Sequence, residues 1–399
     1  MREKSTHQKS LKNNHSLLNR FIKKIPQEVF YIIILFLITR SFLTLTGIFS
    51  RNYLHLAYDY WYVWQYDNHK WLDIWSVWDS GWYLDIAQNG YSPTLKSDIP
   101  QKTCCGQSNV VFYPLYPVSI RFLGGIINNY YLAGIIISNA SFLIASLFFY
   151  KLVAETFNKE VALKSTLILY LFPTSYFFST VLTEGLFLLT SVLTFYFAYK
   201  KKWFTASVFG FLSSLTKSIG VLIIIPVLIS YFLDKYKNKK KLDYKILYFI
   251  LILVAPMLFM LYIHHISGNP LYSFVVEKNS WNHGFVNPVS YLLEYIFHSN
   301  LVMAYFGVLV LSEIILVIFK ARRIGLMLTV YSLIFLITPL FSGGETILAL
   351  PRFSSTAFPV YIALALSIKS KVKLTIVLTF LFSMQITSMF LWNIGLFGY

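Results

Sequence analysis

Long apolar runs alternate with short polar segments along most of this chain of 399 residues. Several runs reach the length of about 20 residues that a helix needs to cross the hydrocarbon core of a bilayer. Only 13% of the residues are charged, whereas about a quarter are charged in a typical soluble domain. The pattern predicts an all-α, polytopic membrane protein with about 11 transmembrane helices.

The predicted spans leave no room for a separate soluble domain. In chain order they are residues 28–49, 131–154, 162–178, 183–199, 203–215, 219–233, 244–266, a run that ends by residue 319, 325–341, a run that ends before residue 369, and 374–392. We therefore expect a polar tail over residues 1–27 and a single membrane domain over residues 28–399. Within that domain, residues 50–130 form the first and longest loop.

The net charge of +17 could suggest nucleic-acid binding, but its distribution argues against this. The lysines and arginines lie in short clusters between apolar runs, at residues 2–24, 200–202, 235–245, 320–323 and 369–373. Such clusters are typical of cytoplasmic loops, and no basic face lies outside them, so nucleic acid is excluded as a partner. The N-terminus is predicted to be cytoplasmic, and the loop 50–130 extracytoplasmic.

The first outer loop concentrates tryptophan and aspartate. It holds six of the nine Trp and six of the eight Asp of the chain. The four tryptophans Trp71, Trp75, Trp78 and Trp82 are spaced four, three and four residues apart, which predicts one apolar helical face lying in the membrane interface. Asp79 and Ser80 resemble a helix start and Gly90 a helix end, so we expect two short helices with a kink near residue 79. An interfacial anchor explains the tryptophans but not the carboxylates.

Two further groups of residues in the sequence suggest chemistry at the outer face. Pro114 and Pro117 mark a rigid entry to a short helix that contains Arg121. Charged residues inside or at the edge of spans are costly and usually functional, and the outer-side examples are Glu184, Lys217 and Arg352, with Arg40 deeper and able to pair within the bundle. For each residue alone a structural ion pair is an equal alternative. Together they place acid and base on one face, as the departure of a phosphate would require.

No metal or cofactor is required by this sequence. The two cysteines, Cys104 and Cys105, are adjacent. Adjacent cysteines rarely form a disulfide, and two thiols cannot complete a zinc site with four ligands. We interpret them as small residues of a loop.

Five short motifs, in this order, resemble those of the PIG-V family of membrane mannosyltransferases, which belongs to the GT-C fold class. They are Trp78-Asp79-x-x-Trp82-Tyr83 with Ile86-Ala87-x-x-Gly90-Tyr91, Phe112-x-Pro114-Leu115-Tyr116-Pro117 with Arg121, Pro173 and Ser179 with Thr183-Glu184-x-x-Phe187, Lys217 with Gly220, and Pro351-Arg352-Phe353 with Phe358-Pro359. The chain departs from the family where Lys217 replaces the more usual arginine and Phe353 the more usual tyrosine.

The resemblance implies transfer of a mannosyl (hexosyl) unit from a polyprenyl-phosphate sugar to an acceptor hydroxyl, on the extracytoplasmic face and with inversion. Asp79 matches the residue that acts as the general base. A lipid phosphate that leaves needs cations, and Arg352, Lys217 and Arg121 are the candidates in that order. The remaining candidates, for an acceptor or a structural role at the site, are Asp85, Glu184, Trp82 and Tyr83.

The expected partners are the lipid-linked donor, a glycolipid or other hydroxyl acceptor, and membrane lipids. The membrane would be the plasma membrane in a prokaryote and the endoplasmic reticulum in a eukaryote. One alternative is a transferase of the same fold that uses another sugar or acceptor. A second is a lipid or sugar transporter, which would place its ionisable groups near the midplane of the membrane rather than at one face.

Overall fold

The computed structural model describes residues 26–54, 66–93, 107–344 and 346–395. Almost all of the predicted tail 1–27, the cysteines at 104 and 105, and the tryptophans at 61 and 64 lie outside these residues. Within the described residues the chain folds into helices joined by short connections, and no strand is present. The prediction of an all-α protein is therefore confirmed.

The helices follow one another closely along the chain. The first are α2 (Gln27–Tyr53), α3 (Lys70–Asp73), α4 (Ser80–Asn89), α5 (Leu115–Ile127), α6 (Tyr130–Thr156), α7 (Lys159–Leu171), α8 (Glu184–Tyr199) and α9 (Trp203–Thr216). The others are α10 (Ile224–Lys237), α11 (Ile250–Ser267), α12 (Tyr272–Ser280), α13 (Pro288–His298), α14 (Leu301–Ile324), α15 (Leu326–Ile337), α16 (Thr346–Ser355), α17 (Pro359–Ser367) and α18 (Lys371–Asn393). Short 3-10 turns are η1 (Asn109–Val111), η2 (Ser175–Ser179), η3 (Ser218–Ile223), η4 (Tyr244–Phe249) and η5 (Thr338–Phe341).

Several helices begin at a residue whose side chain caps the first turn. The amide oxygens of Asn129, Asn158 and Asn300 accept hydrogen bonds of 2.8 to 2.9 Å from backbone N–H groups three residues further on. Asparagine is among the best residues for this position, because it satisfies an N–H group that has no partner inside the helix. These caps fix where α6, α7 and α14 start.

The number of membrane spans differs from the simple count of apolar runs. Among the described residues six helices are long and apolar enough to cross a membrane, or seven if the bent pair α16–α17 is one span. The predicted spans at 183–199, 203–215 and 325–341 correspond to the shorter apolar helices α8, α9 and α15 with η5. A helix of 16 residues such as α8 measures about 24 Å, less than a hydrocarbon core of about 30 Å. The count of about 11 spans is not confirmed.

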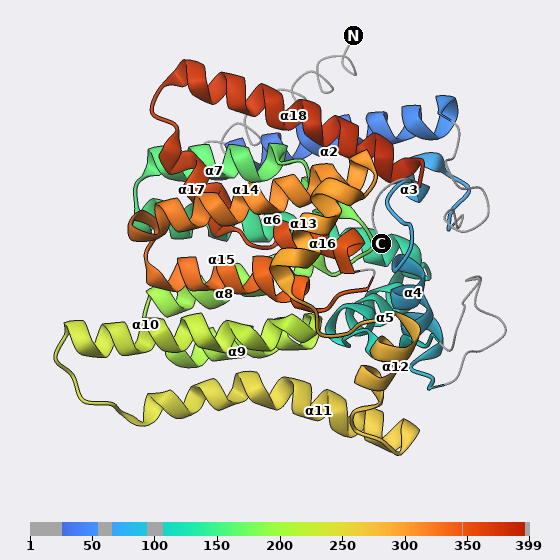
Figure 1. Ribbon diagram of the computed structural model, residues 1–399, viewed down its shortest axis with the longest axis horizontal. Helices are drawn as coiled ribbons and strands as arrows, with labels where there is room; N and C mark the ends of the chain where they lie inside the picture. Colours follow the sequence, from blue (N-terminus) through green and yellow to red (C-terminus); the bar gives the residue numbers. More distant parts are fainter. Residues whose placement is uncertain (1–25, 55–65, 94–106, 345, 396–399) are drawn as a thin grey trace, which may run out of the picture.

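The long helices run roughly side by side, and the two ends of the bundle differ (Figure 1). The connections α10–α11 and α17–α18 lie at one end, and both carry lysine clusters. The short helices α4, α5 and α12 gather at the opposite end. The helices α4 and α5 of the predicted outer loop therefore lie far from the basic connections. The direction in which the chain crosses a membrane stays a prediction.

The four tryptophans of the first loop do not share one helical face, so that prediction is wrong. Helix α3 ends after one turn, and Trp78 adopts a left-handed conformation with φ of 57° before α4 begins. Trp75 and Trp82 are buried inside the protein, whereas Trp71 is 52% exposed.

The physical reason for this difference is tertiary hydrogen bonding. The carbonyl of Ile74 accepts a hydrogen bond from Trp392 Nε1, and that of Trp75 accepts one from the Val181 amide. These bonds hold the segment between α3 and α4 inside the bundle. Two short helices and the end of α4 at Gly90, whose φ is 82°, are as predicted.

Candidate active site

Four charged side chains from four separate elements form one continuous contact. Asp79 precedes α4, Glu184 begins α8, Lys217 lies between α9 and η3, and Arg352 belongs to α16. Nη1 of Arg352 donates to Oδ2 of Asp79 at 2.5 Å, and its Nε donates to Oε1 of Glu184 at 3.1 Å. Nζ of Lys217 donates to the same Glu184 oxygen at 2.6 Å. We call Asp79, Arg352, Glu184 and Lys217 the charge cluster.

Helix interruptions place these residues. Glu184 lies in the first turn of α8, where the helix dipole favours negative charge. Lys217 adopts an extended conformation that ends α9, and the amide of Gly220 donates to the Lys217 carbonyl at 2.9 Å. A Cβ at Gly220 would lie only 2.2 Å from the carbonyl oxygen of Ser213. The motif of a basic residue followed by glycine therefore has a structural reason. The backbone at Gly220 passes so close to that of Ser213 that only glycine fits.

Asp79 is more exposed to solvent than the other three residues of the charge cluster. The side chains of Glu184, Arg352 and Lys217 are 0%, 6% and 8% exposed, whereas that of Asp79 is 26% exposed. Desolvating three ionic groups is costly, and their mutual contacts offset part of that cost. With two carboxylates and two cations the cluster is neutral overall. Asp79 is its member most accessible to a substrate.

The charge cluster keeps unused hydrogen-bonding capacity. Within the described residues, Nη2 of Arg352 has no acceptor, and the buried Oε2 of Glu184 has no partner. The Lys217 ammonium lies 4.7 Å from the centre of the Phe353 ring, a cation–π contact. A spare guanidinium donor beside a second cation is suited to an anionic oxygen such as that of a phosphate.

Two aromatic candidates, Trp82 and Tyr83, are buried in α4 next to Asp79. Trp82 stacks on Phe112 with a centroid distance of 5.7 Å, and Tyr83 packs edge-on against Phe112 at 5.1 Å and Tyr116 at 5.4 Å. Burial raises the pKa of Tyr83, which therefore stays neutral beside Arg352 and Asp79. These rings form an apolar wall beside Asp79.

The remaining candidates lie apart from the charge cluster. Asp85 accepts hydrogen bonds from Asn89 at 2.8 Å and Asn109 at 2.7 Å, so it joins α4 to η1. Of the two roles considered for Asp85, the geometry favours the structural one. Arg121 is exposed and makes no ion pair with any described residue. Arg40 is buried and donates to the Ser175 carbonyl and to Ser179, a pairing inside the bundle.

Three acidic or basic residues were not assigned a role from the sequence. Glu313 is 3% exposed in α14, and neither carboxyl oxygen has a partner among the described residues. A single carboxyl group in an apolar run was the available signal. Glu277, in α12, and His283, in the loop that follows it, are half-buried. Among the described residues no three His, Cys, Asp or Glu side chains group in a way that could hold a metal ion.

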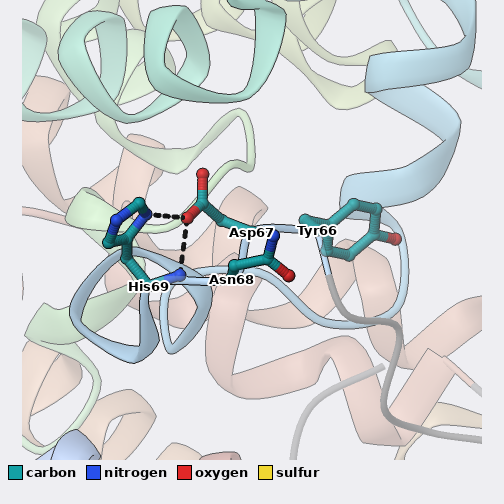
Figure 2. A pocket seen from close by; sticks show the side chains of 4 residues that line it. All are labelled: Tyr66, Asp67, Asn68 and His69. Carbon is teal, nitrogen blue, oxygen red and sulfur yellow. Dashed lines mark hydrogen bonds and ion pairs between the residues drawn. The ribbon is translucent and has the colours of Figure 1, made fainter.

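A separate pocket lies in the first loop and contains no member of the charge cluster. Figure 2 shows its lining residues Tyr66, Asp67, Asn68 and His69. Oδ1 of Asp67 accepts from the His69 amide at 2.7 Å and contacts His69 Nδ1 at 2.8 Å. Nearby, Asp73 contacts Arg51 of α2 at 3.2 Å. The carboxylates of this part of the loop serve to fold it.

The segment after α12 docks against the segment before α16. The Gly284 amide donates to the Ser342 carbonyl at 2.8 Å, and the Val286 amide donates to Phe341 at 3.0 Å. Gly344 has φ of 55°, and a Cβ there would lie 2.5 Å from the carbonyl oxygen of Asn282. This close approach connects the loop that carries His283 to the helix that carries Arg352.

We expect Gly344→Ala to destabilise the protein more than Gly268→Ala. Both glycines have positive φ, which costs an alanine about 1–2 kcal/mol. Nothing lies within 4 Å of a Cβ at Gly268, whereas Gly344 meets backbone atoms. Thermal unfolding in detergent measures the difference. Equal shifts in the two variants would contradict the docked arrangement.

The family model described as Dolichyl-phosphate-mannose-protein mannosyltransferase matches residues 113–261, which run from α5 into α11. No curated protein matches the chain in a sequence comparison. The match covers a little over a third of the chain and includes Glu184 and Lys217 but neither Asp79 nor Arg352.

Two solved structures show the same fold. ArnT from Cupriavidus metallidurans bound to undecaprenyl phosphate aligns with a TM-score of 0.55 at 10% identity, covering 91% of this chain and 76% of that chain. The apo state of the same protein gives a TM-score of 0.53 at 11% identity, with the same coverage. The likeness shows the fold alone, which is GT-C-like. The long apolar helices among the described residues indicate a multi-pass membrane protein. The predicted GT-C fold class is confirmed, whereas membership of the PIG-V family stays a prediction.

Proposed function

We propose that this chain is a membrane glycosyltransferase that moves a mannosyl unit from a polyprenyl-phosphate sugar to an acceptor hydroxyl at the extracytoplasmic face. The observation that carries the proposal is the contact between Asp79 and Arg352, which puts a partly exposed carboxylate beside a buried cation with a spare donor. The matched family model, named for a dolichyl-phosphate-mannose enzyme, and the fold shared with a protein that binds undecaprenyl phosphate support it.

In the proposed reaction Asp79 is the general base. Its carboxylate takes the proton of the acceptor hydroxyl while the acceptor oxygen forms a bond to the anomeric carbon. The bond from that carbon to the phosphate oxygen breaks, and the lipid phosphate leaves with the electron pair. A base must lie within hydrogen-bond reach of the proton that it accepts. One displacement of this kind inverts the anomeric configuration and needs one carboxylate, unlike the two-carboxylate arrangement of glycosidases.

Arg352 and Lys217 stabilise the leaving phosphate in this scheme. The donor is a phosphodiester with one negative charge, and the product is a phosphomonoester with about −1.5 to −2 at pH 7. Preorganised cations that face developing charge lower the barrier without protonating the leaving group. Glu184 holds both cations through one oxygen, and therefore positions them before the donor arrives.

Arg352→Lys should reduce transfer about a hundredfold or more, although the charge is kept. The guanidinium contacts Asp79 and Glu184 through different nitrogens, and a lysine ammonium cannot reproduce that fork. Initial rates at saturating acceptor, with the donor titrated, measure the loss. Arg121→Lys, at the exposed arginine outside the charge cluster, is the matched control and should keep the wild-type rate. Equal losses in both would contradict the assignment.

The direct test is transfer by the purified full-length protein in detergent. Undecaprenyl-phosphate mannose is the donor, and alkyl glycosides serve as acceptors. We expect free undecaprenyl phosphate and a mannosylated acceptor in equal amounts, with the inverted anomer identified by NMR. Release of no lipid phosphate with mannose, glucose or aminosugar donors would overturn the proposal, while release with only another sugar would keep the enzyme class and change the donor.

A further inference from the structure

We propose that Trp281, His283 and Glu277 form the acceptor side of the site, and that they bind the hydroxyl groups of a neutral carbohydrate. The proposal rests on the proposed function and adds to it the chemical class of the acceptor. All three residues belong to the segment from α12 to the start of α13, which is distant in sequence from Asp79. Four observations support it: the docking of the segment, the environment of His283, the environment of Glu277, and the local charge.

The segment is fixed against the elements around the base. The Trp281 ring lies 6.1 Å from Trp82 and 6.2 Å from Phe112 between centroids. At the start of α12, the Ser273 hydroxyl donates to the Val110 carbonyl at 2.6 Å. With the backbone pairing at Ser342, these contacts hold the segment between α4 and the start of α16. Groups on it are preorganised, which limits the ordering cost of binding.

His283 is a half-buried residue of this segment, and its backbone amide donates to the Glu277 carbonyl at 3.3 Å. Burial lowers the pKa of His283 below its ordinary value, and the negative charge of Asp79 opposes this shift without reversing it. A neutral imidazole offers one donor and one acceptor, which matches a sugar hydroxyl. A hydroxyl held by His283 would point its proton toward Asp79, the geometry that a general base needs.

Glu277 provides a second polar group on the same segment. Its carboxyl group is half-buried and has no hydrogen-bond partner or ion pair among the described residues. Burial without a compensating cation raises the pKa of Glu277 to about 7. At neutral pH the carboxyl group can therefore either donate or accept. A half-buried carboxyl group without a partner is costly to keep, and a ligand hydroxyl would satisfy it.

The charges on this side favour a neutral acceptor over a phosphate-bearing one. Asp79 and Glu277 are both acidic, and within the described residues neither His283 nor Glu277 has a cation in contact. The spare donor of the Arg352 guanidinium is assigned to the phosphate of the sugar donor in the proposed reaction, and so is not counted for the acceptor. A neutral polyol can use carboxyl oxygens as acceptors, and the indole of Trp281 offers an apolar face for the C–H groups of a sugar ring. We therefore commit to a carbohydrate.

The experiment measures donor and acceptor parameters separately. Full-length protein in detergent receives undecaprenyl-phosphate mannose, with octyl mannoside or a hexapeptide containing one threonine as acceptor. We expect transfer to octyl mannoside and not to the peptide. In Glu277→Gln and in His283→Gln the KM for octyl mannoside should rise about tenfold, the effect of losing roughly one good hydrogen bond. The donor KM should stay unchanged.

Matched controls lie on the neighbouring helix. Glu294→Gln and His298→Gln make the same chemical changes at exposed positions of α13, and both should keep wild-type parameters. The proposal is overturned if the acceptor KM does not move, if the donor KM rises equally, or if the peptide is the better acceptor. Absence of any donor turnover in the wild-type protein, even to water, would instead reject the proposed transferase function itself.

Discussion

Asp79→Asn should abolish sugar transfer while leaving the protein folded and able to bind the donor. An asparagine can still accept a hydrogen bond from Arg352, but it cannot take a proton from the acceptor. General bases typically contribute about 10²- to 10⁴-fold to a rate, so the residual rate should approach the detection limit. The measurement is kcat with saturating donor and acceptor, with donor binding followed independently by its protection against thermal unfolding.

Asp85→Asn is the control for this prediction, because it makes the same change six residues further on, within α4. Asp85 contacts Asn89 and Asn109, so its loss should lower the melting temperature and leave kcat of the folded protein close to that of the wild type. Asp79→Asn with near-wild-type kcat would remove Asp79 as the base and leave the charge cluster with a structural role only.

Glu184→Gln should be among the most destabilising substitutions in the chain. The Glu184 carboxylate is fully buried and accepts from both Arg352 and Lys217. Removing its charge leaves two buried cations and only one carboxylate, that of Asp79, to balance them. Breaking a buried ion pair costs about 3–5 kcal/mol. Thermal unfolding in detergent should show a large fall in melting temperature, accompanied by loss of transfer.

A double variant distinguishes a specific pairing from general damage. Lys217→Met removes the second cation, so in Glu184→Gln/Lys217→Met the charge imbalance is smaller than in Glu184→Gln alone. We expect the double variant to be more stable than the sum of the single effects by about 0.5–3 kcal/mol, the usual coupling between contacting groups. Strict additivity would show that the contact between Glu184 and Lys217 contributes nothing to stability.

The residues of the charge cluster could be predicted from the sequence, but their contacts with one another could not. Glu184, Lys217 and Arg352 stand out in the sequence because charged groups beside apolar runs are costly, and Asp79 stands out because it matches a family motif. Their assembly into one contact depends on how four separate helix ends meet. The sequence therefore indicated two cations and a base on one face, and only the structure shows that Glu184 holds both cations.

Other features could not be predicted, for identifiable physical reasons. The spacing of Trp71, Trp75, Trp78 and Trp82 fits a helix, but tertiary hydrogen bonds to Ile74 and Trp75 interrupt it. An apolar run is also not always a membrane span, because its helix can be too short. Helices α8 and α9 are examples of such shorter apolar helices. His283 belongs to no motif, and the segment that carries it takes its place only when two loops dock through Gly344.

An experimental structure with bound undecaprenyl phosphate tests the central claim most directly. The account predicts phosphate oxygens within about 3 Å of the Arg352 guanidinium, with Lys217 behind it and Asp79 on the side of His283. A phosphate held instead by Arg121, or by the lysines of the α10–α11 connection, with the contact between Asp79 and Arg352 undisturbed, would contradict it.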